Sequence, residues 1–197
     1  MTADFKRPIV QGSTSPYRRD LLARLRIPFT VAAPDVDETP TAAETPRQLA
    51  CRLAMAKARS VASRFPQAIV IGSDQVADLH GEAIGKPLVH HAAAAQLRRM
   101  SGQLVVFQTA VAVVCDATGF AQMDLAQVQV RFRMLDEREI ESYLVAERPY
   151  DCAGSARSEG LGIVLLDAIQ NDDPTALVGL PLIRTCRMLR AAGASLL

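Results

Sequence analysis

Apolar positions along the chain follow two periods, one typical of strands and the other of helices. Short apolar runs at 8–12, 29–33, 68–76 and 104–115 have the length of buried strands. Helical spacing marks the segments that follow Pro16 and Thr45, together with 90–100, 135–146 and 179–192. Because strands and helices are interspersed, we predict an α/β fold with a mixed sheet flanked by helices.

Local signals sharpen several of these boundaries. Ser15 can cap a helix whose first residue is Pro16, and Thr45 to Gln48 read as a capping box. Residues 116–119 are turn-forming and join the run 104–115 to an alternating segment at 128–133, which predicts a hairpin. The stretches 35–44 and 151–162 are rich in loop-forming residues and are expected to be loops. In the closing helix, Pro181 is expected in the first turn.

Length and charge limit the classes of function. A chain of 197 residues suits one domain, or two small lobes that share one sheet. The formal net charge of +1 provides no strong field for nucleic acid or for an acidic membrane. An anionic ligand would therefore be held by a local cluster of basic side chains.

Cysteine and histidine usage disfavours a metal site built from these residues. The four cysteines form no CxxC pair and sit among apolar or small residues, which predicts buried free thiols. Only three histidines are present, and two of them are adjacent. The chain shows neither a secretory signal nor a run of ~20 apolar residues, so we expect a cytoplasmic protein with no membrane association.

Basic and hydroxyl side chains gather where the first strand meets the first helix. Ser13, Ser15, Arg18 and Arg19 surround the start of that helix. Helix N-terminal amides and arginines favour phosphate, and basic residues are unfavourable at this end of a helix unless an anion offsets them. The plainer alternative is a simple N-cap followed by a solvated basic turn.

Acidic groups occur in two places that could meet in space. Asp74 follows a buried strand, where ligands of α/β proteins usually bind, and it could hold a divalent cation or deprotonate a water. Asp35, Asp37 and Glu38 could complete a Mg²⁺ site with it. The alternatives are a turn-capping aspartate and a solvated run of charge.

Two lysines and a glycine-rich stretch complete the candidate chemistry. Lys86, held next to Pro87, could neutralise phosphate charge, and Lys57 lies on the apolar face of the second helix. The stretch 154–162 matches neither a phosphate-binding Walker motif nor a dinucleotide fingerprint. From the residues alone, the expectation is a phosphate-handling α/β enzyme that uses Mg²⁺.

The order of these motifs resembles the Maf family along nearly the whole chain. The resemblance rests on S-x-S-P-x-R-R, V-D-E, A-K-A, G-S-D-Q-V, G-K-P, S-E-G-x-G-I and D-P-x-x-L-V-G-L-P-L-I, at 13–19, 36–38, 56–58, 72–76, 85–87, 158–163 and 173–183. It implies a single domain over residues 1–197, with two lobes and a central cleft, and a fold similar to that of inosine triphosphate pyrophosphatases.

The resemblance also implies roles for individual residues. Asp74 matches the proton acceptor of the family, and Glu38 and Asp74 match acidic groups near its divalent metal, Mg²⁺ or Mn²⁺. The positions that match triphosphate contacts are Ser13, Ser15, Arg18, Lys57 and Lys86, with Arg19 as a weaker member.

Three positions sort the family by base, and here they hold Tyr17, Gln75 and Glu159. These residue types are similar to the branch that acts on 7-methyl-GTP, whereas the branch acting on dTTP and UTP tends to have Arg, Thr and Gln. An aromatic ring can stabilise the cationic methylated base, and Glu159 can accept hydrogen bonds from the guanine edge. A pyrimidine would leave a buried carboxylate unpaired.

The expected activity is hydrolysis of 7-methyl-GTP to 7-methyl-GMP and diphosphate, which would keep modified nucleotides out of nucleic acids. The alternatives are a dTTP/UTP pyrophosphatase of the same family and a non-catalytic nucleotide-binding regulator of cell division. A nucleic-acid-binding module is disfavoured by the net charge. The only partner expected is a small nucleotide substrate. A homodimer stays open, because no self-complementary patch can be read from the sequence.

Overall fold

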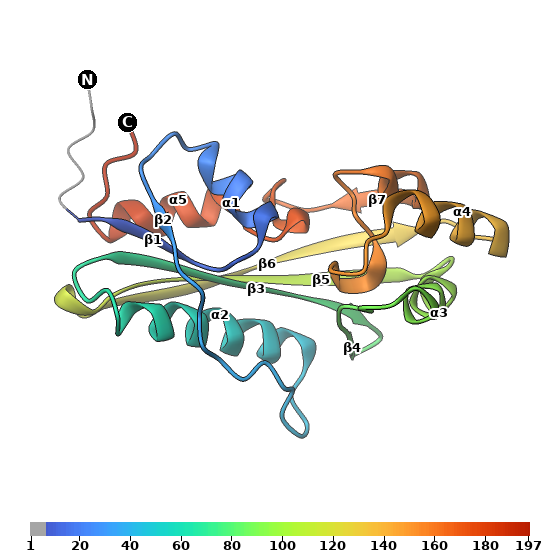
Figure 1. The fold of residues 1–197 in the computed structure, drawn as a ribbon, viewed down its shortest axis with the longest axis horizontal. Coiled ribbons are helices and arrows are strands. Elements are labelled where there is room, and N and C mark those ends of the chain that lie inside the picture. The colour runs from blue at the N-terminus through green and yellow to red at the C-terminus, as the bar shows by residue number, and fades with distance from the viewer. Residues whose placement is uncertain (1–6) are drawn as a thin grey trace.

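A mixed seven-stranded sheet forms the centre of the computed structural model, which describes residues 7–197 (Figure 1). The strands are β1 (Ile9–Gly12), β2 (Thr30–Val31), β3 (Ile69–Leu79), β4 (Glu82–Ile84), β5 (Leu104–Cys115), β6 (Phe120–Phe132) and β7 (Leu166–Gln170). The helices are α1 (Pro16–Ala23), α2 (Pro46–Ala62), α3 (His90–Met100), α4 (Glu137–Glu147) and α5 (Leu182–Ala191).

Strand order in the sheet is β2-β1-β3-β5-β6-β7, and β4 pairs with the end of β3. β1 runs parallel to both β2 and β3, whereas the remaining pairs are antiparallel. The α/β class with a mixed sheet flanked by helices is therefore confirmed.

Helices cover both faces of the sheet, and α3 and α4 lie at one end of it (Figure 1). α2 packs on one face through an apolar cluster that includes Leu53 and Val61, while α1 and α5 cover the opposite face. A third apolar cluster, which includes Phe107 and Phe132, joins α3 and α4 to the far ends of β5 and β6. Burial of these apolar side chains is the main term that stabilises the fold.

Unequal strand lengths expose part of β3. β1 ends at Gly12, which is paired with Gly72, and β3 continues for seven more residues. Consequently Ser73, Asp74 and Gln75 run past the end of β1, next to the turn that leads into α1.

Most of the local signals in the sequence are confirmed. Ser15 caps α1 with Pro16 at its start, and Thr45 with Gln48 forms the capping box of α2. The helix at 90–100 and the strand at 104–115 have the predicted bounds.

The structure corrects the sequence interpretation in three places. β4 and β7 were not expected, because β4 has only three residues and β7 is mostly exposed, so neither contains an apolar run. The closing helix was expected to begin at Gly179, but α5 begins at Leu182 and Pro181 is its N-cap. The cause is a short 3₁₀ turn at Ala176–Val178 that ends at Gly179 with φ +118, outside the helical region.

All four cysteines are free, as expected, although only Cys115 is fully buried and the others are half-buried. No helix within residues 7–197 has both the length and the apolar composition needed to cross a membrane.

Gly72 allows α2 to lie directly against β3. A Cβ at this position would overlap the Ala54 carbonyl oxygen and lie 2.5 Å from the Ala58 nitrogen, both in the backbone of α2. Backbone atoms cannot rotate away as a side chain can, so the close approach of helix and strand requires glycine here.

We therefore predict that Gly72→Ala lowers the free energy of unfolding by about 3 kcal/mol, because the added methyl group forces α2 away from the sheet. The measurement is urea denaturation followed by circular dichroism. Gly85→Ala is the control, since a Cβ there meets nothing within 4 Å. Equal stability of Gly72→Ala and the wild type would contradict this account of the packing.

Candidate active site

A cavity of about 280 Å³ opens beside the exposed part of β3. Its walls come from the β1–α1 turn and the first turn of α1, the loop before α2, one residue each of α2 and β3, and three segments near 86, 151–159 and 177–179. The predicted site residues that line it are Ser13, Ser15, Tyr17, Arg18, Glu38, Lys57, Gln75, Lys86 and Glu159. Segments far apart in the sequence thus meet at one place.

The Lys57 ammonium lies between two carboxylates. Its Nζ is 2.7 Å from Asp74 Oδ1 and 2.7 Å from Glu38 Oε1. Lys57 and Asp74 are only 5% and 6% exposed, so this ion pair is largely removed from water. A buried lysine is normally tolerated only when a carboxylate offsets its charge, and here Asp74 provides that partner.

Glu38 is the exposed end of this group. Partial burial would by itself raise its pKa, but the hydrogen bond from Lys57 and the charges of Lys57, Lys86 and Arg18 outweigh it, and the pKa of Glu38 is lowered. Glu38 therefore stays ionised at neutral pH.

Two serines shape the turn into α1. Ser13 is buried and its Oγ accepts a hydrogen bond from the Ser15 nitrogen at 3.2 Å, whereas Ser15 Oγ accepts one from the Arg18 nitrogen at 3.4 Å. The first turn of α1 contains no acidic residue. The positive end of this helix thus faces the cavity without an anion from the first turn.

Arg18 is half-buried in the cavity wall, and a main-chain oxygen fixes its guanidinium. Its Nε donates to the Gly179 carbonyl oxygen at 2.8 Å, and no other hydrogen bond to this guanidinium forms within residues 7–197. Burial lowers the pKa of Arg18, against the raising effect of Asp74 and Glu38. An arginine remains charged under such conditions, so its Nη groups are available to an anion.

Lys86 and Arg19 differ in their positions. Lys86 is exposed and lines the cavity, as expected for a group that meets a phosphate. Arg19 is not among the lining residues, and its exposed side chain pairs with Asp20 at 3.4 Å. The structure thus brings Lys86, but not Arg19, to the cavity.

The Gln75 side chain has a fixed orientation. Its Nε2 lies 3.0 Å from the Ala176 oxygen, 2.9 Å from the Leu177 oxygen and 3.0 Å from Thr109 Oγ1. The Thr109 hydroxyl donates to the Ala176 oxygen, so it accepts from Gln75. With the NH₂ group directed at these acceptors, Gln75 is left with its carbonyl oxygen for a ligand, which makes it a hydrogen-bond acceptor in the cavity.

Tyr17 packs against a cation that the sequence interpretation did not foresee. The Arg157 guanidinium lies 5.1 Å from the centre of the Tyr17 ring, a cation–π distance. The cavity is lined by Tyr17 but not by Arg157, so this cation lies against the ring outside the cavity. Burial raises the pKa of Tyr17, and nearby Cys152 and Asp151 add to the effect, so the phenol stays neutral.

Glu159 differs from the expectation in one respect. It was expected as a buried carboxylate, but its side chain is 28% exposed and lies 3.4 Å from Arg157 Nε. Arg157 also pairs with Glu147 at 2.9 Å. Because Glu159 already has a cationic partner, a pyrimidine would not leave it unpaired, and that part of the specificity argument was wrong.

The carboxylates present fit a divalent cation only in part. Within the described residues, no group of three or more Asp, Glu, His or Cys side chains is placed to hold a metal. Glu38 and Asp74 offer oxygen ligands, but they share the Lys57 ammonium. Mg²⁺ commonly uses one or two carboxylates together with substrate phosphates, so this donor set fits a cation that binds with a nucleotide.

Several functional positions were missed by the sequence interpretation. The cavity is also lined by Asp151, Cys152 and residues 177–179, and backbone carbonyls of the last segment hold Arg18 and Gln75. The motif at 173–183 was noted without a role. Its order was a usable signal, but a carbonyl has no sequence signature of its own.

The chain is similar to one described protein family and to several named proteins. The family described as Maf-like protein matches residues 8–192. A 7-methyl-GTP pyrophosphatase of Albidiferax ferrireducens is 70% identical over 197 residues, which are 100% of this chain and 99% of that protein. Proteins of the same name from Polaromonas sp. (70% identity, 96% of this chain and 87% of the relative) and Methylobacillus flagellatus (54%, 94% and 97%) are also similar.

Removing the buried ammonium should cost stability as well as function. We predict that Lys57→Met lowers the free energy of unfolding by about 3 kcal/mol, because it leaves Asp74 buried without a cation. Lys86→Met is the matched control: it removes an exposed lysine from the same cavity and should change stability by less than about 0.5 kcal/mol. Chemical denaturation of both variants tests this, and equal effects would show that Lys57 does not offset a buried charge.

Proposed function

The chain belongs to the Maf family, and from that premise we propose that it hydrolyses 7-methyl-GTP to 7-methyl-GMP and diphosphate. The observation that carries the proposal is that relatives named for this activity match the whole chain at up to 70% identity. The cavity supports it, because its lining includes cations that suit a triphosphate together with an aromatic ring and acceptors that suit a base. Removal of a modified nucleotide before it enters nucleic acid is the corresponding role.

In the proposed reaction, a water attacks the α-phosphorus and the bond between this phosphorus and the α–β bridging oxygen breaks. Asp74 accepts the proton of the attacking water, and diphosphate leaves with the bridging oxygen. Asp74 Oδ1 is held by Lys57, whereas Oδ2 has no hydrogen-bond partner within residues 7–197, which leaves it available to a water.

We propose that the triphosphate occupies the cationic end of the cavity. Arg18 and Lys86 would pair with phosphate oxygens, and Lys57 would offset the charge that develops on them. The hydroxyls of Ser13 and Ser15 and the start of α1 add hydrogen-bond donors. Arg19 lies outside this set, so we no longer assign it a contact.

Glu38 and Asp74 are the residues that would hold a divalent cation, Mg²⁺ or Mn²⁺, together with the nucleotide. When bound, such a cation would neutralise phosphate charge and favour the departure of diphosphate. Lys57 would then move from its shared position between the two carboxylates or remain beside them as a second cation.

The base would occupy the opposite end of the cavity. Gln75 offers an acceptor, and Glu159 at the rim offers another, which suits the N1 and N2 donors of guanine. Tyr17 would stack on the base with the ring face that Arg157 leaves free. The negative charge of Glu159 complements the cationic methylated ring, although Arg157 shares it.

We further propose that residues 1–197 act as one domain with two lobes, in which the nucleotide lies in the cleft between them. A cytoplasmic location fits both the substrate and the four free thiols.

A nucleotide panel tests the proposed function. We expect 7-methyl-GTP to give the highest kcat/KM among 7-methyl-GTP, GTP, dTTP, UTP and CTP, each with Mg²⁺ or Mn²⁺. The products should be the monophosphate and diphosphate, identified by chromatography.

A preference for dTTP or UTP would retain the reaction and overturn the assignment of the base. Absence of diphosphate release from every nucleotide, in a folded sample, would contradict the enzyme assignment and favour a nucleotide-binding regulator.

A further inference from the structure

The loop between β7 and α5 supplies main-chain oxygens to both ends of the cavity. The Gly179 oxygen accepts from Arg18 Nε at 2.8 Å and from Ser73 Oγ at 2.9 Å. The Ala176 and Leu177 oxygens accept from Gln75 Nε2 at 3.0 and 2.9 Å. One short segment, 176–179, therefore orients both Arg18 and Gln75, the side chains proposed to meet the triphosphate and the base.

A buried carboxylate holds this loop from the other side. Asp173 is 0% exposed, and its Oδ1 lies 3.1 Å from Thr175 Oγ1, whose single hydroxyl hydrogen it shares with the nearer Leu180 oxygen. Its Oδ2 accepts from the Arg184 nitrogen at 3.1 Å, in the first turn of α5, where the helix dipole favours a negative charge. Its backbone oxygen also accepts from the Ala176 nitrogen at 2.9 Å.

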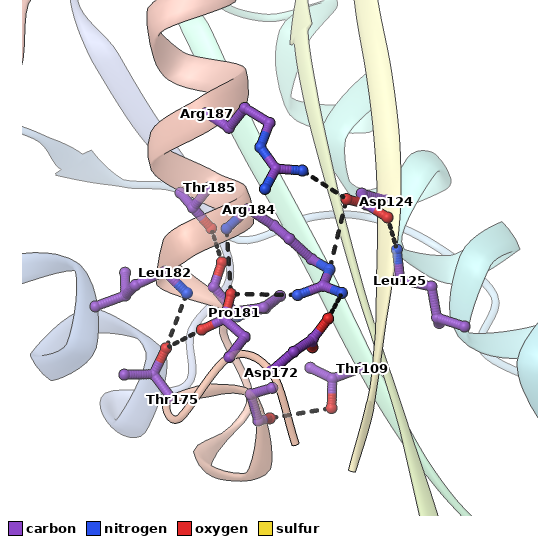
Figure 2. A network of polar contacts seen from close by, with 12 residues as sticks. Thr109, Asp124, Leu125, Asp172, Thr175, Pro181, Leu182, Arg184, Thr185 and Arg187 are labelled. Carbon is purple, nitrogen blue, oxygen red and sulfur yellow. Dashed lines mark hydrogen bonds and ion pairs between the residues drawn. The ribbon is translucent and has the colours of Figure 1, made fainter.

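Thr175 connects this part of the loop to the start of α5. Its Oγ1 accepts from the Leu182 nitrogen at 2.8 Å (Figure 2). The same oxygen lies 2.8 Å from the Leu180 oxygen. The hydroxyl thus closes the loop on itself directly before α5. Since Asp173 and Thr175 fix both ends of 176–179, they determine where its carbonyls point.

Arg184 links the loop between β7 and α5 to β6 of the sheet. Its guanidinium lies between the exposed Asp172, at 2.9 Å, and Asp124 of β6, at 3.4 Å, and its Nη1 is 3.7 Å from Asp173 Oδ2 (Figure 2). The fully buried Asp173 thus has a cationic neighbour, although Arg184 Nε, 3.4 Å from Asp124, makes no hydrogen bond within the described residues. These charge pairs hold the loop against the sheet.

We propose that Asp173 is a positioning residue of this enzyme: it acts through Thr175 and the carbonyls of 176–179 to orient Gln75 and Arg18. Asp173 does not line the cavity. The inference rests on the proposed function, because it assigns these two side chains to the base and the triphosphate. It predicts that disturbing Asp173 changes base selectivity, an effect that loss of stability alone does not produce.

The test compares Asp173→Ala and Thr175→Val with Asp172→Ala. Asp172→Ala is the matched control because it removes a neighbouring carboxylate that pairs with the same Arg184 side chain, whereas only Asp173 accepts from the Arg184 main-chain nitrogen and contacts Thr175. We expect Asp173→Ala and Thr175→Val to raise KM and to lower the ratio of kcat/KM for 7-methyl-GTP over UTP by about tenfold, with Asp172→Ala close to wild type. Circular dichroism sets the assay temperature at which every variant is folded.

Asp173→Asn adds a rescue. An asparagine can accept from the Arg184 nitrogen and donate to Thr175 Oγ1, which still donates to the Leu180 oxygen. It should therefore restore most of the selectivity that Asp173→Ala loses.

Unchanged selectivity in folded Asp173→Ala and Thr175→Val, or an equal loss in Asp172→Ala, would overturn the inference. If the wild type prefers another nucleotide, the assignment of the base fails, and the ratio of that nucleotide to 7-methyl-GTP serves the same comparison. If the wild type hydrolyses none, the proposed function fails, and the inference is tested by calorimetric binding of the same nucleotides to the four variants.

Discussion

The Lys57 ammonium between Asp74 and Glu38 is the interaction on which the rest of the site depends. It joins α2, β3 and the loop before α2 through three side chains that are distant from one another in the sequence. Removing the Lys57–Asp74 ion pair from water costs solvation free energy. The electrostatic attraction between the two charges offsets this cost only when their geometry is good. Gly72 provides this geometry, because it lets the backbone of α2 approach β3 within the reach of a lysine side chain.

The elements around the Lys57–Asp74 pair form the cavity. β1 is short, so β3 continues past its end: Gln75 lines the cavity, whereas Asp74 is not among the lining residues and lies behind Lys57, which is. The start of α1 faces the same space with its positive end, and α5 and the loop before it close the other side with carbonyl oxygens. A charged end and an acceptor end thus arise from one sheet edge and two loops, and together they match a nucleoside triphosphate better than either would alone.

Sequence reasoning succeeded where a signal is local. The cap at Ser15, the capping box at Thr45 and the strand 104–115 are each encoded within a few residues, and the structure contains all of them. It failed for β4 and β7, whose stability comes from pairing with long neighbours rather than from apolar content. The start of α5 was misplaced because the left-handed turn at Gly179 interrupts a helix-like pattern.

The site was predictable in its members more than in its contacts. The ordered motifs predicted nearly every charged residue that lines the cavity. The misplaced contact of Arg19 depends on the direction in which the first turn of α1 presents this side chain. The cation over Tyr17 and the support from Asp173 depend on contacts between distant segments. Such contacts, and all those made by main-chain oxygens, leave no pattern in one sequence.

The most direct test of the central claim is the turnover number of Asp74→Asn on the preferred nucleotide at saturating substrate and metal. Loss of the proposed proton acceptor should lower kcat by about 10²-fold or more, with the chain still folded. Asp78→Asn, on the same strand but in contact with Gly81 and Gln108 rather than with Lys57, should keep wild-type turnover. Full turnover by Asp74→Asn would contradict the account and move the reaction away from the Lys57–Asp74 pair.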